Sequence, residues 1–267
     1  EWVDSSQDEW IEIENPATHE IIAKVPRGNK DDVDRAVKAA RAAFETWQYT
    51  PLKERVELMK KVVAGLEERR QELIETITKE LGSPYKVSAE VHTDPFILEA
   101  KHYIKTASEF PYEQRRLTSV VRREPVGVVG GLTPWNFPLE QIEKKVVPAL
   151  LAGNCVVLKP SQYTPLTAYI LAEEIDKAGY PAGVFNLVTG RGGEVGNALS
   201  THEDVDMISF TGSTGAGREV ARMALGNIKK IALELGGKSA AILLDGGAWE
   251  NGIHSVLETG VPNAGQT

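Results

Sequence analysis

Val126-Gly127-Val128-Val129 opens the stretch of sequence that decides the fold, because it is the first of several short apolar runs separated by helical patterns. Runs of this length, rich in β-branched residues, are typical of strands buried on both faces. The further runs are residues 155–158, 184–188, 207–210 and 231–233, and the helical patterns are residues 138–152, 165–178, 193–200 and 214–225. Alternation of strand and helix predicts right-handed crossovers and a parallel sheet.

Polar and glycine-containing motifs come directly after these runs. The carboxyl ends of parallel strands meet at one edge of a sheet, and ligands of open sheets bind outside that edge. Glycines before a helix, as in residues 210–217, let backbone amides approach a pyrophosphate, although a lone glycine-rich turn is a weak signal. The motifs are Thr133-Pro134-Trp135-Asn136, Lys159-Pro160-Ser161-Gln162, Gly190-Arg191-Gly192-Gly193, Thr211-Gly212-Ser213 and Glu234-Leu235-Gly236-Gly237. We therefore expect a ligand site at this edge.

The sequence before residue 126 has a different organisation. Strand-like runs at residues 10–13 and 21–25 flank Asn15-Pro16-Ala17-Thr18, which predicts a hairpin. Helices are expected after the cap Asn29, after Pro51, and up to Gly82.

Two further expectations concern residues 85–110 and 119–123. Residues 85–110 are predicted to be helical, with a break at Pro95. Residues 119–123 read as an exposed, charged strand that pairs with another chain or with a distant segment.

Composition and charge narrow the class of protein. The 267 residues are 42% apolar and 25% charged, as in an ordinary globular protein. The net charge of -8 argues against nucleic acid or an anionic membrane as a partner. No apolar stretch approaches the ~20 residues of a membrane helix, and no secretory signal is visible at the amino terminus.

Cysteine and histidine usage adds two expectations. Cys155 is the single cysteine, so an intrachain disulfide is excluded and a reducing, cytoplasmic location is expected. Because it lies in an apolar run, Cys155 is interpreted as a small buried hydrophobe rather than a nucleophile. The histidines are scattered without metal-ligand spacing, so no metal site is expected.

Asn136 lies between two prolines, which restrict the backbone around it. A side-chain amide held in this way can donate to a developing oxyanion, whereas the simpler reading is a turn whose asparagine satisfies local backbone groups. Glu234 leaves an apolar strand before two glycines. A carboxylate that is partly desolvated at such a place can act as a base, whereas the simpler reading is a surface glutamate.

Three motifs in this order resemble the aldehyde dehydrogenase superfamily: Pro134-Trp135-Asn136-Phe137-Pro138, Leu233-Glu234-Leu235-Gly236-Gly237-Lys238-Ser239 and Asn263-Ala264-Gly265-Gln266-Thr267. The resemblance covers essentially the whole chain and about the first half of a typical member. It implies an α/β fold with a Rossmann-like parallel sheet, and oxidation of an aldehyde to a carboxylic acid with hydride transfer to NAD(P). The reaction passes through a cysteine thioester, and the cysteine is expected at position 268, directly after Thr267.

Several alternatives stay open beside this reading. The chain is expected to be the first part of a longer enzyme, but a cleaved polypeptide or a truncated, non-catalytic nucleotide-binding fragment has the same sequence. Within the superfamily, the branch that acylates coenzyme A typically lacks the base, so Glu234 favours the hydrolytic branch.

The resemblance also assigns roles to residues. Asn136 corresponds to the oxyanion donor, Glu234 to the base that activates water, and Lys145 to a lysine facing the active site, with Lys144 beside it as the competing choice. The residues implied to contact the nucleotide are Thr133, Pro134, Trp135, Lys159, Ser161, Gln162, Gly192, Gly196, Phe210, Thr211, Gly212, Ser213, Leu235 and Gly236. NAD is the expected cofactor. NADP stays possible, because Gln162 replaces a ribose-binding glutamate that would repel a 2′-phosphate.

The implied organisation has four parts. Residues 1–110 form a hairpin and helices that pack on the cofactor domain, and residues 111–125 form an oligomerisation strand segment, part of the oligomerisation hairpin that the resemblance implies. Residues 126–245 form the Rossmann-like core, and residues 246–267 begin the catalytic domain. The expected partners are a small-molecule aldehyde and further copies of the chain, as a homodimer or homotetramer. Gln141 and Lys144, after the oxyanion donor, favour a polar or anionic aldehyde.

Overall fold

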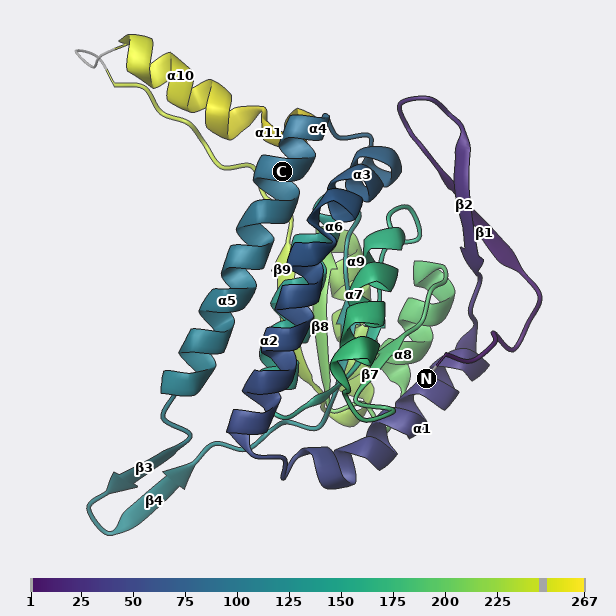
Figure 1. Ribbon diagram of the computed structural model, residues 1–267, viewed down its shortest axis with the longest axis vertical. Helices are drawn as coiled ribbons and strands as arrows, with labels where there is room; N and C mark the ends of the chain where they lie inside the picture. The colour runs from purple at the N-terminus through teal and green to yellow at the C-terminus, as the bar shows by residue number, and fades with distance from the viewer. Residues whose placement is uncertain (1, 245–248, 267) are drawn as a thin grey trace.

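A computed structural model describes residues 2–244 and 249–266, so the predicted boundary at residues 245/246 and Thr267 lie outside the described residues. Its centre is a five-stranded sheet with helices on both faces (Figure 1). The strands are β5 (Val128–Leu132), β6 (Cys155–Lys159), β7 (Phe185–Leu187), β8 (Met207–Gly212) and β9 (Lys230–Leu235). Their spatial order is β7-β6-β5-β8-β9, and every neighbouring pair is parallel. The predicted parallel α/β fold is confirmed.

The order of the strands reverses at β5, which pairs with β6 on one side and with β8 on the other. Successive strands therefore run outward in opposite directions from this point, and the crevice at such a reversal is where open sheets bind ligands. All residues of β5 and β6 are buried, which explains why their sequences are apolar without alternation.

Helices cover both faces of the sheet. Helices α1 (Lys30–Trp47), α8 (Asn197–Thr201) and α9 (Thr214–Ala224) pack on one face, and α6 (Pro138–Leu151) and α7 (Leu166–Ala178) pack on the other. Helices α2 (Leu52–Glu68) and α5 (Asp94–Glu109) form a further layer outside α6, visible in Figure 1. Residues 193–200, predicted as one helix, are instead a π-helical turn, η2 (Gly192–Gly196), followed by α8.

The amino-terminal helices and strands agree with those predicted from the sequence. Strands β1 (Trp10–Glu14) and β2 (Ile21–Pro26) form the predicted antiparallel hairpin. Asn29 caps α1 through a capping box with Asp32. Helix α3 (Arg70–Leu81) ends at Gly82, whose φ of 71° is the left-handed conformation that glycine adopts without strain.

The predicted break at Pro95 is wrong. Helix α4 (Tyr85–Val87), a π-helical turn η1 (Ser88–Thr93) and α5 follow one another without a loop. Pro95 lies in the first turn of α5, directly after the π turn, at whose end the Asp94 N–H donates to the Ala89 carbonyl. The irregularity of this segment is the π turn before the proline.

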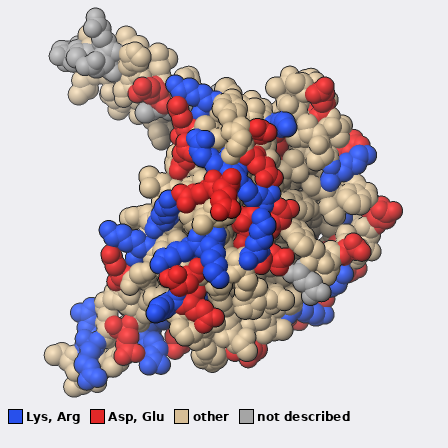
Figure 2. Space-filling view, in the orientation of Figure 1, with Lys and Arg blue, Asp and Glu red and all other residues tan. Residues whose placement is uncertain are grey.

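The exposed strand expected at residues 119–123 is present and forms a hairpin, so only the alternative of pairing with a distant segment is corrected, and pairing with another chain stays a prediction. Strand β4 (Ser119–Arg122) pairs with its immediate neighbour β3 (Glu113–Arg116), because Leu117 adopts a φ of 41° that allows a two-residue connection. The hairpin projects from the body (Figure 1), and basic side chains gather on it (Figure 2).

A single apolar core joins the sheet to the amino-terminal helices. It runs from Trp47 of α1 and Leu66 of α2 through Leu139 of α6 to Val157 of β6. The remaining elements are a short 3-10 turn η3 (Leu225–Asn227), α10 (Trp249–Gly260) and α11 (Pro262–Gly265). Within the described ranges, every helix is too short or too polar to cross a membrane.

Glu143 of α6 is a titratable group inside this core. Its exposed fraction is 0%, and neither carboxyl oxygen has a hydrogen-bond partner among the described residues. Burial, with a smaller contribution from Glu99, raises the pKa of Glu143 to about 9. The folded chain therefore keeps a proton that the unfolded chain releases near pH 4.5, so the contribution of Glu143 to stability is lost as the pH rises from there to about 9.

Replacing Glu143 with Gln is expected to remove this pH dependence and to stabilise the protein at pH 8 by a few kcal/mol, since one pKa unit corresponds to about 1.4 kcal/mol. Urea unfolding of the wild type and the variant at pH 6 and pH 8 measures the effect. The exposed Glu45→Gln is the control. An equal loss of stability with pH in wild type and Glu143→Gln contradicts the prediction.

Candidate nucleotide-binding and catalytic site

Direct hydrogen bonds connect the motifs that follow β5, β6 and β7. The backbone N–H of Thr133 donates to the Lys159 carbonyl at 3.3 Å, and the Thr164 hydroxyl donates to the Trp135 carbonyl at 3.2 Å. The Lys159 ammonium donates to the Gly190 carbonyl at 3.3 Å. Residues separated by up to 57 positions in sequence are thus brought to the predicted edge of the sheet because the strands are parallel.

Lys159 is a buried cation at this edge. Its ammonium contacts the carbonyls of Pro160 and Gly190, and burial lowers its pKa to about 8. At neutral pH the group is mostly protonated without a carboxylate beside it in the part of the chain that the structure describes. An anionic or hydroxyl-bearing ligand near Lys159 would therefore be stabilised.

The amino terminus of α9 opens at the same edge after β8. Ser213 caps the helix, and its hydroxyl accepts from the Ala216 N–H at 3.2 Å. A Cβ on Gly217 would lie 2.4 Å from a methyl group of Leu235, so α9 packs closely on the end of β9 at this point. A Cβ on Gly212 would lie 2.6 Å from the Phe210 ring. The exposed first turn of α9 can hold an anion through its free N–H groups.

Lys145, Thr211 and Glu234 meet across three elements. The Lys145 ammonium of α6 donates to the Thr211 hydroxyl of β8 at 2.7 Å, and Thr211 pairs with Glu234 of β9. Burial lowers the pKa of Lys145 to about 8, while the negative charge of Glu234 acts in the opposite direction. Lys144 points elsewhere and forms an ion pair with Glu140. The geometry thus separates the two neighbouring lysines, and Lys145 is the one near Glu234.

Glu234 lies at the carboxyl end of β9, as expected, but it is exposed rather than partly buried. The reason is that β9 is an edge strand, paired only with β8 among the described strands. The desolvation that was expected to favour a base at this position is therefore not provided by the described residues.

Asn136 lies in a network with Gln266, Asn263 and His92, none of which the sequence assigned to the site. Its side-chain amide donates to the Gln266 carbonyl at 2.6 Å, and its own carbonyl accepts from the Asn263 amide at 2.7 Å. Asn263 in turn contacts buried His92 at 3.0 Å. Asn263 had a signal in the motif that contains it, whereas His92 is a lone histidine in a helical region and carried none.

The other predicted nucleotide contacts lie around the same edge. Thr133 and Ser161 are buried, Trp135 and Gly192 are exposed, and Pro134 and Gln162 are intermediate. The Thr133 hydroxyl has no partner within the described ranges, and the Ser161 hydroxyl accepts from the Tyr163 N–H at 3.2 Å. A Cβ on Gly196 would lie 3.8 Å from Lys159, which places η2 beside this lysine, and Gly236 is exposed directly after β9.

Cys155 is buried in β6, at the opposite end of the strand from Lys159. Burial raises the pKa of its thiol to about 12, which disfavours the nucleophilic thiolate. The interpretation of Cys155 as a buried hydrophobe is confirmed.

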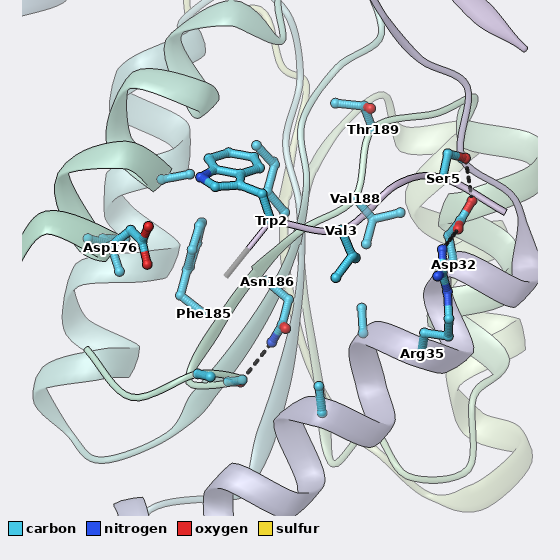
Figure 3. A pocket seen from close by; sticks show the side chains of 18 of the residues that line it. Trp2, Val3, Ser5, Asp32, Arg35, Asp176, Phe185, Asn186, Val188 and Thr189 are labelled. Atoms are coloured by element: carbon cyan, nitrogen blue, oxygen red, sulfur yellow. Dashed lines mark hydrogen bonds and ion pairs between the residues drawn. The ribbon is translucent and has the colours of Figure 1, made fainter. Parts of the chain in front are cut away.

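A separate cavity of about 420 Å³ lies beside the edge strand β7, between α1 and α7. Figure 3 shows Trp2 and Val3 of the amino-terminal segment pointing into it, with Asp32 and Arg35 on the α1 side. Trp2 stacks on Tyr169 of α7, with ring centroids 5.7 Å apart. The residues that line this cavity include none of the predicted nucleotide contacts, so the cavity is distinct from the edge described above.

Comparison with known proteins identifies relatives of this chain. Residues 2–267 match the aldehyde dehydrogenase family. A protein of this family from Staphylococcus haemolyticus is 47% identical over 245 residues, which are 92% of this chain and 52% of the relative. A Staphylococcus aureus relative is 46% identical, with the same coverage. The chain thus spans about half the length of the curated relatives it matches.

Solved structures agree over the whole chain. An aldehyde dehydrogenase from Pseudomonas syringae, a cysteine-to-alanine variant in complex with NAD+ and octanal, superposes with a TM-score of 0.95 at 39% identity, covering 100% of this chain and 55% of that one. The NAD+ complex of an aldehyde dehydrogenase from Bacillus cereus superposes with a TM-score of 0.96 at 37% identity, covering 100% and 56%. With its parallel sheet and the motifs at the carboxyl edge, the chain belongs to the aldehyde dehydrogenase family.

Proposed function

We propose that the protein carrying this chain oxidises an aldehyde to a carboxylic acid with NAD(P) as hydride acceptor. The observation that carries the proposal is the cluster of Lys145, Thr211 and Glu234 at the edge where α9 begins and Asn136 lies. This edge combines an amide donor, a carboxylate and an anion-binding helix terminus. The family and the NAD+ complexes of its relatives support the same assignment.

The residues at the edge fit a dinucleotide. The free N–H groups of the first turn of α9, with Gly212 and Ser213, suit the pyrophosphate, and Lys159 suits a ribose hydroxyl. The unpartnered hydroxyl of Thr133 and the neutral amide of Gln162 offer further polar contacts. When bound, the nicotinamide accepts the hydride that leaves the substrate carbon.

The chemistry assigns one task to each group. A cysteine thiolate attacks the aldehyde carbon, and the Asn136 amide donates to the oxyanion that forms. Loss of hydride from that carbon leaves a thioester. Glu234 then takes a proton from water as the water attacks the thioester, and the acid leaves as the thiol is restored. Lys145, held by Thr211, keeps a positive charge near Glu234.

The nucleophile is proposed to follow Thr267 directly. Cys155 is excluded by its burial and by the raised pKa of its thiol. The Asn136 amide donates to the Gln266 carbonyl, so the donor lies beside the segment that leads to position 268.

Two polar residues of α6, Gln141 and Lys144, are the basis for proposing a class of substrate. Lys144 and Gln141 lie after the oxyanion donor, but the charge of Lys144 is paired with Glu140. An anionic aldehyde would have to compete with this carboxylate. We therefore narrow the proposal to a polar, uncharged aldehyde. This differs from the apolar octanal in the structure of the Pseudomonas syringae relative.

Glu234→Gln is expected to slow hydrolysis of the thioester, lowering kcat by about 10²–10⁴-fold because a general base is lost. The first turnover should persist as a burst of NADH equal to the enzyme concentration. Stopped-flow absorbance with the full-length protein measures both phases, and Glu219→Gln on the exposed face of α9 is the control. A steady-state rate equal to that of the wild type would remove the assigned role of Glu234.

Gln162→Glu is expected to shift selectivity from NADP toward NAD by roughly 10–100-fold in kcat/KM. The reason is that charge repulsion of about 1–4 kcal/mol acts between the new carboxylate and a 2′-phosphate at about 4 Å. The ratio of kcat/KM for the two nucleotides measures the change. Gln162→Asn keeps a neutral amide and serves as the control. An unchanged ratio in Gln162→Glu would show that this residue does not face the adenosine ribose.

A further inference from the structure

His92 lies outside every motif, yet it contacts the segment that carries Asn136 by two routes. Its ring packs against the Phe137 ring with centroids 4.9 Å apart and an interplanar angle of 42°. Its Nε2 lies 3.0 Å from Oδ1 of Asn263, whose amide donates to the Asn136 carbonyl. His92 is 1% exposed and Asn263 is 5% exposed, so water does not compete for these contacts.

The hydrogen bonds fix the orientation of each group. A backbone carbonyl can only accept, so the Asn263 Nδ2 must face the Asn136 carbonyl and Oδ1 must face His92. Since Oδ1 is an acceptor, Nε2 of His92 must carry a hydrogen. Burial lowers the pKa of His92, against smaller opposing effects of Asn263 and Glu140, which favours the neutral ring. His92 is thus a neutral donor in the Nε2–H tautomer.

The local backbone is built to present these two residues. His92 lies in the π-helical turn η1, where the Thr93 hydroxyl donates to the Ser88 carbonyl at 2.8 Å. Asn263 has a φ of 51°, a left-handed conformation that asparagine tolerates better than most residues. Asparagine also supplies both the acceptor and the donor that the position uses.

We propose that His92 is a positioning residue, which holds Asn136 through Asn263 and Phe137 in the place from which the Asn136 amide donates to the oxyanion. The inference rests on the proposed function. His92 does not itself contact the reacting atoms, since Asn263 and Phe137 lie between it and the Asn136 amide. Loss of its donor should therefore weaken stabilisation of the oxyanion and leave substrate and nucleotide binding intact.

The test compares three variants of the full-length protein. His92→Phe keeps an aromatic ring against Phe137 but removes the donor, and His92→Gln returns an N–H near the position of Nε2. His102→Phe changes an exposed histidine of α5 and is the matched control. We expect kcat to fall by about 10–100-fold in His92→Phe, part of the effect of losing an oxyanion donor. KM for aldehyde and the Kd for NAD should stay within about twofold, and His92→Gln should recover most of kcat.

Two kinetic results would overturn the proposal. One is a kcat in His92→Phe equal to that of the control. The other is a kcat in His92→Gln as low as in His92→Phe, which would assign the effect to packing rather than to the donor.

The tautomer gives a readout that does not depend on activity. Ring ¹⁵N shifts of the labelled wild type, assigned with His92→Gln, should show the neutral Nε2–H form at pH 7. A neutral Nδ1–H form would contradict the hydrogen bond to Asn263, also in the event that His92→Phe does not fold. A wild type that oxidises no aldehyde would defeat the proposed function instead, and the ¹⁵N shifts would still decide whether His92 donates to Asn263.

Discussion

Burial of β5 and β6 on both faces is the constraint on which the rest of the structure depends. Every residue of these two strands is buried, so helices must cover the sheet on either side. A chain that places a helix between successive strands returns each strand in the same direction. All carboxyl ends then meet at one edge, and so do the motifs that follow the strands.

The same burial sets the electrostatics of that edge. Lys145 and Lys159 are buried near this edge, and burial lowers the pKa of each to about 8. Their hydrogen-bond partners are a hydroxyl and backbone carbonyls, and Glu234 is the carboxylate near Lys145. The amino terminus of α9 adds a partial positive charge at the same edge. The edge is therefore suited to an anionic ligand in a protein whose net charge is -8.

Elements whose signals are local were predictable from the sequence, whereas those set by contacts were not. The Asn29 cap, the stop at Gly82 and the parallel strands each follow from a local pattern. The position of Pro95 was misread, because a proline in the first turn of a helix and a proline that breaks one look alike in sequence. The residues of β3 are polar and show no strand pattern, so the sequence left β4 to pair with another chain or with a distant segment, and only the fold shows β3 beside it.

For the candidate site, the sequence by itself determined which chemical groups are present and that their strands end at one edge. The apolar runs and the order of the motifs were sufficient for this. Only the tertiary structure decided between Lys144 and Lys145, because neighbouring residues of a helix point about 100° apart and burial selects one of them. The tertiary structure also leaves Glu234 exposed on an edge strand and brings His92 into contact with Asn263, which is 171 positions away in sequence. Contacts over such separations depend on packing, for which a single sequence carries no local signal.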